Sequence, residues 1–150
     1  MGTGKSVVGK QIARRLNMKF VSTDDIIAER EKRSITEIFE KSGEPYFRDI
    51  EKEIVKEVSN FDNTVIAAGG GAVLDEGNVA NLKKGGVMIC LNATPEVIYE
   101  RTKKYKHRPL LNVDKPVEKI RQLLNSRAPF YAKADYQVDT TNKSIEEAIK

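Results

Sequence analysis

The residues with the clearest chemical signature lie at the beginning of the sequence, where Gly4, Lys5 and Ser6 follow Gly2 and Thr3. They supply the last three positions of the phosphate-binding loop pattern G-x-x-x-x-G-K-[ST]. Glycines in such a loop let backbone N–H groups turn toward phosphate oxygens at a helix N-terminus. The lysine places a positive charge on the β- and γ-phosphates, and the serine hydroxyl ligates Mg²⁺. These residues therefore predict a site for a nucleoside triphosphate and Mg²⁺.

A helix is expected directly after this loop, because apolar residues recur there at helical spacing. They are Val7, Val8, Ile12, Ala13 and Leu16. Without that helix, the alternative would be a flexible, lysine-containing segment that binds nothing. The first glycine of the pattern and the hydrophobic strand before it have no counterpart in residues 1–150. We therefore expect that the sequence begins inside its domain, and that residues 1–150 alone are poorly stable and little active.

A carboxylate, Asp24, follows a short predicted strand at residues 19–22. At the end of a strand it could face the γ-phosphate and an acceptor hydroxyl. The alternative is that Asp24 only complements the partial positive charge of a helix N-terminus, which is the role we expect for its neighbour Asp25. The residues alone leave both roles open for Asp24.

Arg48 and Glu51 lie three positions apart in a predicted helix, so they share a face and could pair. The simpler interpretation is a surface ion pair of little consequence. The functional interpretation is that Glu51 holds the Arg48 guanidinium so that it can bind a carboxylate with two hydrogen bonds.

Three further segments carry candidate ligand-binding residues. Gly69, Gly70 and Gly71 follow a buried strand, and three glycines in a row suggest a ligand lying against bare backbone. Arg108 lies in a basic, aperiodic loop at about residues 103–115 and could close over a triphosphate. Arg127, before Ala128-Pro129, could be a second carboxylate ligand or only a helix C-cap.

The elements that must position these residues alternate between strands and helices. Buried strands are predicted at 64–68 and 87–91 and a more polar one at 136–140. Helices are predicted at 46–59, 79–84, 95–104 and 116–127, and further helices are expected to open at 23–25, after the caps Ser34 and Ser144, and at Pro129. This alternation predicts an α/β domain with a parallel sheet and right-handed crossovers. Ligands of such sheets bind at the carboxyl ends of the strands, so the separate segments are expected to meet there.

Composition narrows the class of protein. Hydrophobic residues make up 39% and charged residues 32% of the 150 residues, which is typical of one ordinary soluble domain. No apolar run or leader indicates a membrane partner. The net charge of +4 suits anionic ligands but is not gathered in one block, so nucleic acid is not expected. Cys90, the only cysteine, cannot form an internal disulfide and is expected to be a buried, inert thiol in the cytoplasm.

In combination, the motifs resemble those of the shikimate kinase family over essentially the whole chain. The motifs are Gly2-Thr3-Gly4-Lys5-Ser6, Ser22-Thr23-Asp24, Phe47-Arg48-x-x-Glu51, Gly69-Gly70-Gly71, Arg108-Pro109-Leu110-Leu111 and Arg127-Ala128-Pro129-x-Tyr131. The last two separate this family from other small kinases of the nucleoside-monophosphate-kinase type. The resemblance implies a three-layer P-loop fold with strand order 2-3-1-4-5, whose first strand is absent from residues 1–150.

The resemblance also implies an activity, namely ATP-dependent phosphorylation of the shikimate 3-hydroxyl by a cytoplasmic monomer. In that case Gly2, Thr3, Gly4, Lys5, Ser6 and Val7 hold the ATP phosphates, Ser6 ligates Mg²⁺, Arg101 contacts adenine and Arg108 closes as a lid. Asp24 orients the accepting hydroxyl and takes its proton. Arg48 and Arg127 bind the substrate carboxylate, Glu51 supports Arg48, and Gly69, Gly70 and Gly71 contact substrate hydroxyls.

One position departs from the family pattern. Where the family usually has the first aspartate of Asp-x-Asp, which helps hold Mg²⁺ through its water shell, this sequence has Ser22. Two alternatives to the shikimate kinase activity stay open. One is another small-molecule P-loop kinase, such as a gluconate kinase, which should lack the paired arginines. The other is a module that binds nucleotide or shikimate without catalysis.

Overall fold

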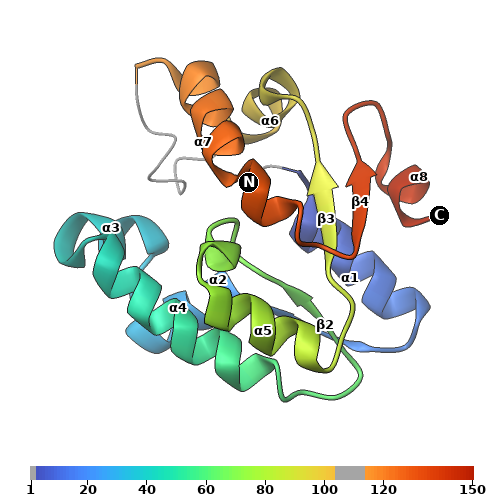
Figure 1. Cartoon of the computed structure of the whole chain (residues 1–150), viewed down its shortest axis with the longest axis horizontal. Coiled ribbons are helices and arrows are strands. Elements are labelled where there is room, and N and C mark those ends of the chain that lie inside the picture. The colour runs from blue at the N-terminus through green and yellow to red at the C-terminus, as the bar shows by residue number, and fades with distance from the viewer. Residues whose placement is uncertain (1–2, 104–113) are drawn as a thin grey trace.

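The computed structural model describes residues 3–103 and 114–150. Helices and strands alternate along this part of the chain (Figure 1). The helices are α1 (Lys5–Arg15), α2 (Thr23–Glu31), α3 (Ile35–Ser42), α4 (Glu44–Val58), the 3-10 helix η1 (Ala72–Leu74), α5 (Glu76–Lys84), α6 (Pro95–Thr102), α7 (Pro116–Tyr131) and α8 (Ile145–Ile149). The strands are β1 (Lys19–Ser22), β2 (Thr64–Ala67), β3 (Ile89–Asn92) and β4 (Tyr136–Asp139). The α/β class is therefore confirmed.

The strands form two parallel pairs rather than one continuous sheet. β1 pairs with β2, with Ser22 opposite Ala67, and β3 pairs with β4, with Asn92 opposite Asp139. Within the described residues no hydrogen-bonded ladder joins β2 to β3. The family order 2-3-1-4-5 without its first strand contains these same two neighbouring pairs, which agrees with the prediction.

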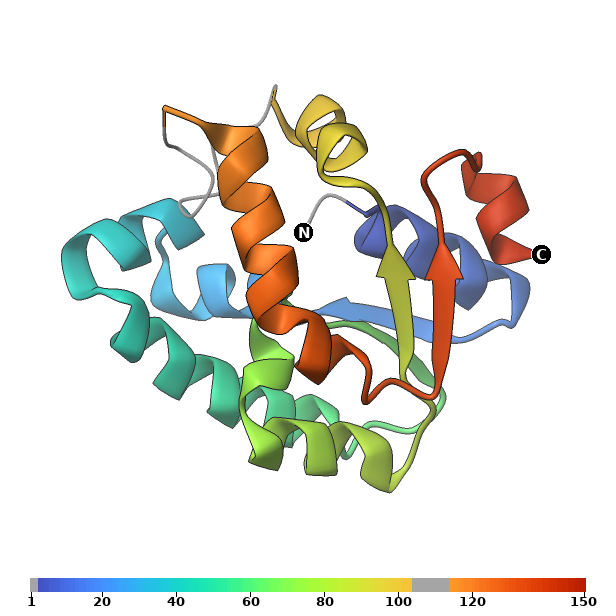
Figure 2. The same cartoon turned by 45° about the horizontal axis from the view of Figure 1, so that its top comes forward.

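Helices cover both faces of the β1–β2 pair. Neighbouring residues of a strand point to opposite faces, so each strand contributes side chains to both layers. Val21 and Ile66 face a core built from Ile27, Ile38, Phe47, Ile54 and Val58 of α2, α3 and α4. On the other face Gly9 of α1 lies so close to the Phe20 ring that a Cβ would come within 2.8 Å of it. In Figures 1 and 2 the β3–β4 pair stands beside this unit, with α6 near its upper end, α7 on its left and α8 on its right.

The local sequence signals explain most of the helix starts. The hydroxyls of Ser34 and Ser144 accept hydrogen bonds from the backbone N–H groups of Glu37 and Glu147, as expected of N-caps. α4 begins at Glu44, two residues before the predicted start at 46, because Gly43 ends α3 and Pro45 fits the first turn of the next helix.

Several predictions about helix and strand limits are wrong. α5 begins at Glu76 rather than at Val79. α7 does not stop at Arg127 but continues to Tyr131, with Pro129 inside it and the N–H of Ala132 bonded to the carbonyl of Ala128. The segment 87–91 is not a buried strand: Val87 precedes β3 and is 66% exposed, and Ile89 is 54% exposed. β3 pairs on one side only within the described residues, so its apolar side chains are less covered than those of a central strand.

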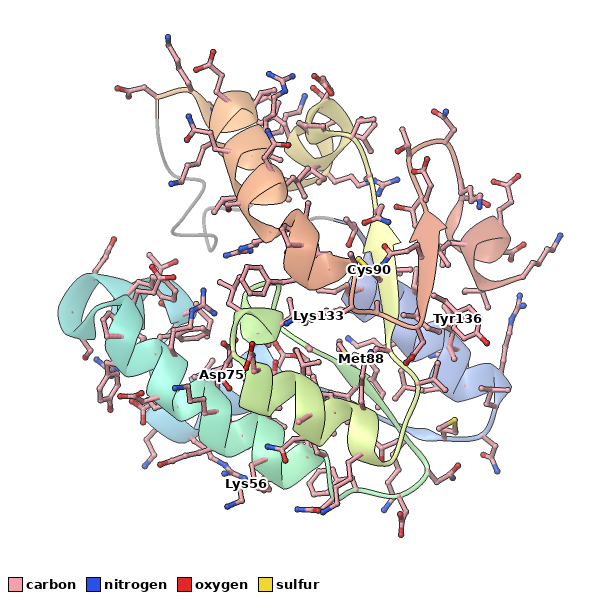
Figure 3. All side chains as sticks on the ribbon, viewed as in Figure 1. Lys56, Asp75, Met88, Cys90, Lys133 and Tyr136 are labelled. Atoms are coloured by element: carbon pink, nitrogen blue, oxygen red, sulfur yellow. The ribbon has the colours of Figure 1, made fainter. Side chains whose placement is uncertain are left out.

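Cys90 lies on β3, where Figure 3 labels it above Met88. It is half-buried rather than fully buried, and its thiol donates to Oδ1 of Asn92 at 3.3 Å. Burial raises the pKa of this thiol, so little of it is in the reactive thiolate form near neutral pH. Within residues 3–103 and 114–150 no helix combines the length and apolar character that crossing a membrane requires.

Candidate active site

The phosphate-binding loop leads into α1 through a left-handed glycine. Gly4 is the N-cap residue, with φ of 92°, and its carbonyl accepts the first helical hydrogen bond from Val8 N–H at 2.9 Å. Only glycine adopts this φ without steric cost. No side chain caps α1, which is how a helix N-terminus remains open for an anion. Lys5 begins the helix, Ser6 and Val7 lie on its exposed first turn, and Gly2 is outside the described residues.

Asp24 lies in the first turn of α2, next to the end of β1. Its Oδ1 is buried and has no hydrogen-bond partner among the described residues. The helix N-terminus is instead capped by Ser22, whose hydroxyl accepts from Asp25 N–H at 3.4 Å. The residue that departs from the family pattern therefore has a local role, and Asp24 is not needed as the cap.

Gly69 brings two carboxylates together. A Cβ at this position would lie 2.8 Å from Oδ1 of Asp24 and 2.9 Å from Oε2 of Glu51. Both oxygens are buried, and neither has a hydrogen-bond partner within residues 3–103 and 114–150. The backbone N–H of Gly69 donates to Thr23 Oγ1 at 3.0 Å, which joins the end of β2 to the start of α2. The absence of a side chain at residue 69 is what allows both carboxylates to approach.

Arg48 and Glu51 form an ion pair, with 2.9 Å between Nη1 and Oε1. Glu51 is only 1% exposed, so this is not the surface pair that the spacing alone allowed. Burial raises the pKa of the Glu51 carboxyl and the charge of Asp24 adds to this, whereas Arg48 and Arg127 oppose it. Burial acts against the charged form of Arg48, yet its acidic partners Glu51 and Glu44 raise the pKa of the guanidinium.

The backbone of Gly71 packs against the guanidinium of Arg48. A Cβ at residue 71 would come within 2.6 Å of Cζ and of both terminal nitrogens of Arg48. The guanidinium also lies 5.2 Å from the centre of the Phe47 ring. Two of the three consecutive glycines thus make room for charged side chains of this site. The close approach of these side chains to the backbone explains why residues 69 and 71 are glycine.

Helix α7 supplies the second arginine. Arg127 is 5% exposed and its charge reaches Glu51, because it lowers the pKa of that carboxyl. Its Nη1 lies 3.5 Å from the hydroxyl of Tyr131, which donates to the Gly70 carbonyl at 2.8 Å. Since α7 continues to Tyr131, Arg127 is not a C-cap, and that alternative is wrong.

Arg101 is among the described residues, whereas Arg108 is not. Arg101, on α6, donates to Oγ1 and to the carbonyl oxygen of Thr140, at 3.1 and 2.7 Å. The Thr140 hydroxyl in turn lies 3.4 Å from the carbonyl oxygen of Thr3, beside the phosphate-binding loop. Arg101 is therefore held close to that loop. Arg108 and most of the predicted lid, residues 104–113, are outside the described residues.

The residues present fit Mg²⁺ in one particular way. Within the described residues there is no cluster of three or more His, Cys, Asp or Glu that could enclose a metal ion. Mg²⁺ keeps several waters and is commonly held by one or two protein oxygens together with substrate phosphates. The exposed hydroxyl of Ser6, at the start of α1, suits that mode of binding.

Sequence reasoning missed the positioning roles of Thr23 and Tyr131. Thr23 belongs to the motif Ser22-Thr23-Asp24 and Tyr131 to the motif Arg127-Ala128-Pro129-x-Tyr131, but neither motif indicates what these two residues do. Thr23 is fully buried and accepts from Gly69, while Tyr131 ties α7 to Gly70. A small hydroxyl residue directly after a strand was the available signal for Thr23. The Tyr131 contact joins positions 61 residues apart and had no local signal.

Comparisons with known proteins agree with this geometry. The shikimate kinase family model matches residues 1–150. The shikimate kinase of Caldanaerobacter subterraneus subsp. tengcongensis is 50% identical over 150 residues, which cover 100% of this chain and 88% of that protein. The shikimate kinase of Thermoanaerobacter pseudethanolicus is 48% identical with the same coverage. The structure of shikimate kinase from Acinetobacter baumannii in complex with shikimate superposes with a TM-score of 0.93 at 37% identity, covering 99% of this chain and 82% of that one.

The shared architecture defines the class, a P-loop kinase fold of the nucleoside-monophosphate-kinase type. Within that class, the family match over all 150 residues and the 50% identity to a curated relative identify the family. The chain belongs to the shikimate kinase family.

Proposed function

We propose that this protein transfers the γ-phosphoryl group of ATP to the 3-hydroxyl of shikimate, giving shikimate 3-phosphate and ADP in the pathway to chorismate and the aromatic amino acids. The observation that carries the proposal is the pair of Arg48 with the buried Glu51, whose carboxyl is also within the electrostatic influence of Arg127 and Asp24. It combines two cations that can bind a carboxylate with a carboxylate that can receive a proton.

The substrate carboxylate would bind Arg48 and Arg127, with Glu51 holding Arg48 in place. Arg48 and Arg127 come from different helices, α4 and α7, so a bound carboxylate would be gripped from two sides. The ring hydroxyls would then lie against Gly69, Gly70 and Gly71. Positioning of this kind supplies much of the rate enhancement in phosphoryl transfer, because little covalent chemistry is asked of the protein.

Asp24 would orient the 3-hydroxyl and accept its proton while the hydroxyl oxygen attacks the γ-phosphorus and the bond to the β–γ bridging oxygen breaks. Lys5 and the N–H groups of residues Gly2, Thr3, Gly4, Ser6 and Val7 would hold the phosphates. Mg²⁺, with Ser6 as a ligand, would neutralise phosphate charge when bound. Arg101 would lie near adenine, and Arg108 would add positive charge from the lid.

ATP as the co-substrate favours the cytoplasm, and we infer a monomer that acts on small molecules, with neither nucleic acid nor a membrane as partner. A gluconate kinase would share the ATP site, but the paired arginines argue against it. Ser22, in place of the family's aspartate, is the feature of the site that favours a module that binds without catalysis. Against it, Asp24 keeps one carboxylate oxygen free of hydrogen bonds to the described residues.

The test is an ADP-release assay with ATP, Mg²⁺ and shikimate, with the product identified by mass spectrometry. Shikimate should give stoichiometric ADP and shikimate 3-phosphate, gluconate should give neither, and Asp24→Asn should lose at least about 100-fold in kcat. Exposed Asp25→Asn, one residue away, is the matched control. ATP binding without any shikimate-dependent turnover would leave only the binding module.

A further inference from the structure

We propose that Glu44 acts as a built-in competitor for the substrate carboxylate on Arg48, and so sets how strongly a ligand must bind before it enters the site. The structure shows the contact that this requires: Oε1 of Glu44 lies 3.1 Å from Nη2 of Arg48. The inference rests on the proposed function, in which Arg48 receives the carboxylate of shikimate.

Glu44 is not needed to hold the guanidinium in place. Glu51, almost fully buried, binds Nη1 at 2.9 Å, and the Phe47 ring lies 5.2 Å from Cζ. Gly71 closes the guanidinium in from another direction, at a distance that leaves no space for a Cβ. Three contacts other than Glu44 therefore already fix the position of Arg48.

Nη2 is the nitrogen that a ligand can reach. Its partner Glu44 is 45% exposed, in contrast to Glu51, which is 1% exposed. Glu44 and Arg48 line the same hollow, together with Pro45, Lys52 and Gly71. Nε of Arg48 is buried and, in the part of the chain that the structure describes, has no hydrogen-bond partner. A carboxylate that binds Arg48 through two nitrogens must use Nη1 or Nη2, and Nη1 is already bonded to the buried Glu51. Glu44 therefore occupies the place that the ligand needs.

Release of Glu44 should cost little. Ion pairs four residues apart on a helix contribute weakly. Water also solvates the Glu44 carboxylate, which is 45% exposed, although its partner Arg48 is only 20% exposed. The released carboxylate also stays in the first turn of α4, where the helix dipole favours a negative charge. A weak competitor of this kind lowers the affinity for every ligand by a small factor. It also disfavours uncharged analogues, such as a shikimate ester, because they cannot replace the negative charge on Nη2.

The experiment compares wild type with Glu44→Gln and Glu44→Ala in steady-state kinetics and in calorimetric titrations with shikimate. We expect KM and Kd for shikimate to fall about two- to fivefold in both variants. We expect kcat and the KM for ATP to stay within about twofold, because Glu44 does not contact the reacting groups. Glu53→Gln is the matched control: Glu53 is exposed on the same helix, has no partner among the described residues, and should change none of these values.

An increased KM for shikimate in both variants would overturn the proposal, because it would show that Glu44 positions Arg48 for the substrate. An unchanged KM would overturn it as well, since no competition would then exist. Failure of the proposed function looks different: wild type itself would then show neither shikimate binding nor shikimate-dependent turnover. Melting temperatures of both variants, compared with that of Glu53→Gln, separate altered binding from altered folding.

Discussion

At the scale of single residues, Glu51 has two oxygens in different situations. Oε1 is bonded to Arg48, whereas Oε2 is buried without a partner near Asp24. A buried carboxylate with one unpaired oxygen costs free energy in its charged form, because nothing replaces the water it has lost. Burial therefore outweighs the two arginines and raises the pKa of this group.

This raised pKa predicts how stability depends on pH. The folded state holds the Glu51 proton more tightly than the unfolded state, in which the pKa is close to 4.5. As pH increases from 4.5 to the folded pKa, the unfolded state ionises first and the contribution of Glu51 to stability is lost. The unfolding free energy of wild type minus that of Glu51→Gln should therefore decrease in this range, by about 1.4 kcal/mol for each unit of pKa shift.

Urea unfolding of both proteins at a series of pH values measures this difference. Glu53→Gln is the control and should stay within about 0.5 kcal/mol of wild type. If the difference instead increased with pH, the ion pair with Arg48 would dominate over burial.

Gly69→Ala should impair catalysis more than folding. A Cβ would lie 2.8 and 2.9 Å from the two carboxylate oxygens and would push Asp24 and Glu51 apart. Displacements below 1 Å at such a centre can lower rates strongly, so we expect kcat/KM for shikimate to fall on the order of 10- to 100-fold. The matched control is Gly85→Ala, since a Cβ at Gly85 meets no atom within 4 Å. Equal activities of Gly69→Ala and Gly85→Ala would show that a Cβ at residue 69 does not displace the two carboxylates.

At the scale of elements, Thr140 connects the segment after β4 to other parts of the site. Its side-chain hydroxyl lies 2.9 Å from the carbonyl oxygen of Asn92 and 3.4 Å from that of Thr3, and it accepts from Arg101. α6, the end of β3 and the phosphate-binding loop are thus joined through one buried side chain.

Thr140→Val should weaken ATP binding in particular. The change removes the hydroxyl while keeping the shape, so the buried groups around it lose a partner, at a cost of about 1–3 kcal/mol in unfolding free energy. Because Thr3 is next to Gly4, for which we propose phosphate binding, the KM for ATP should increase more than the KM for shikimate. Thr141→Val is the control: that hydroxyl donates to Asp139 and accepts from Thr94 N–H, so its hydrogen bonds do not involve the loop at Thr3. An unchanged ratio of the KM for ATP to the KM for shikimate in Thr140→Val would contradict a role of Thr140 in ATP binding.

The elements that could be predicted from the sequence are those with local causes. β1 was predicted at residues 19–22, where the structure has it, and Ser34 and Ser144 cap their helices as expected. The predicted helix end at Arg127 is wrong because proline, here Pro129, usually ends a helix. Pro129 lies so close to the end of α7 that it costs few hydrogen bonds there. Burial of β3 was overestimated because it depends on neighbouring strands, which an apolar run does not specify.

At the scale of the whole molecule, the site is assembled from two parts of the chain. Asp24, Arg48 and Gly69 belong to the part that contains β1 and β2, whereas Arg127 and Tyr131 lie on α7, between β3 and β4 in the chain. The motifs identified the residues that would meet, but the proximity of Asp24 and Glu51 at Gly69 required the packing of three elements and could not be derived from spacing.

Shikimate binding should therefore stabilise the molecule through Arg127. At a ligand concentration of 100 Kd the expected gain is about 2.7 kcal/mol, which corresponds to an increase in Tm of roughly 5–10 °C for a domain of this size. Arg127→Gln should lose the increase with shikimate and keep the increase with ATP in differential scanning fluorimetry. Arg121→Gln is the control, because Arg121 lies on the same helix in an exposed pair with Glu96. A full shikimate response in Arg127→Gln would exclude Arg127 as a ligand.

The way the strands pair has a consequence for the covalent chain. Each parallel pair closes within its own stretch, residues 19–67 and 89–139, and the chain passes between the two stretches once, through Gly85 and Gly86 after α5. Contacts such as Tyr131 to Gly70 and Thr140 to Thr3 join residues before Gly85 to residues after Gly86 without a peptide bond. Two separately expressed fragments divided at Gly85–Gly86 should therefore reassemble, and their activity would then depend on the concentration of both.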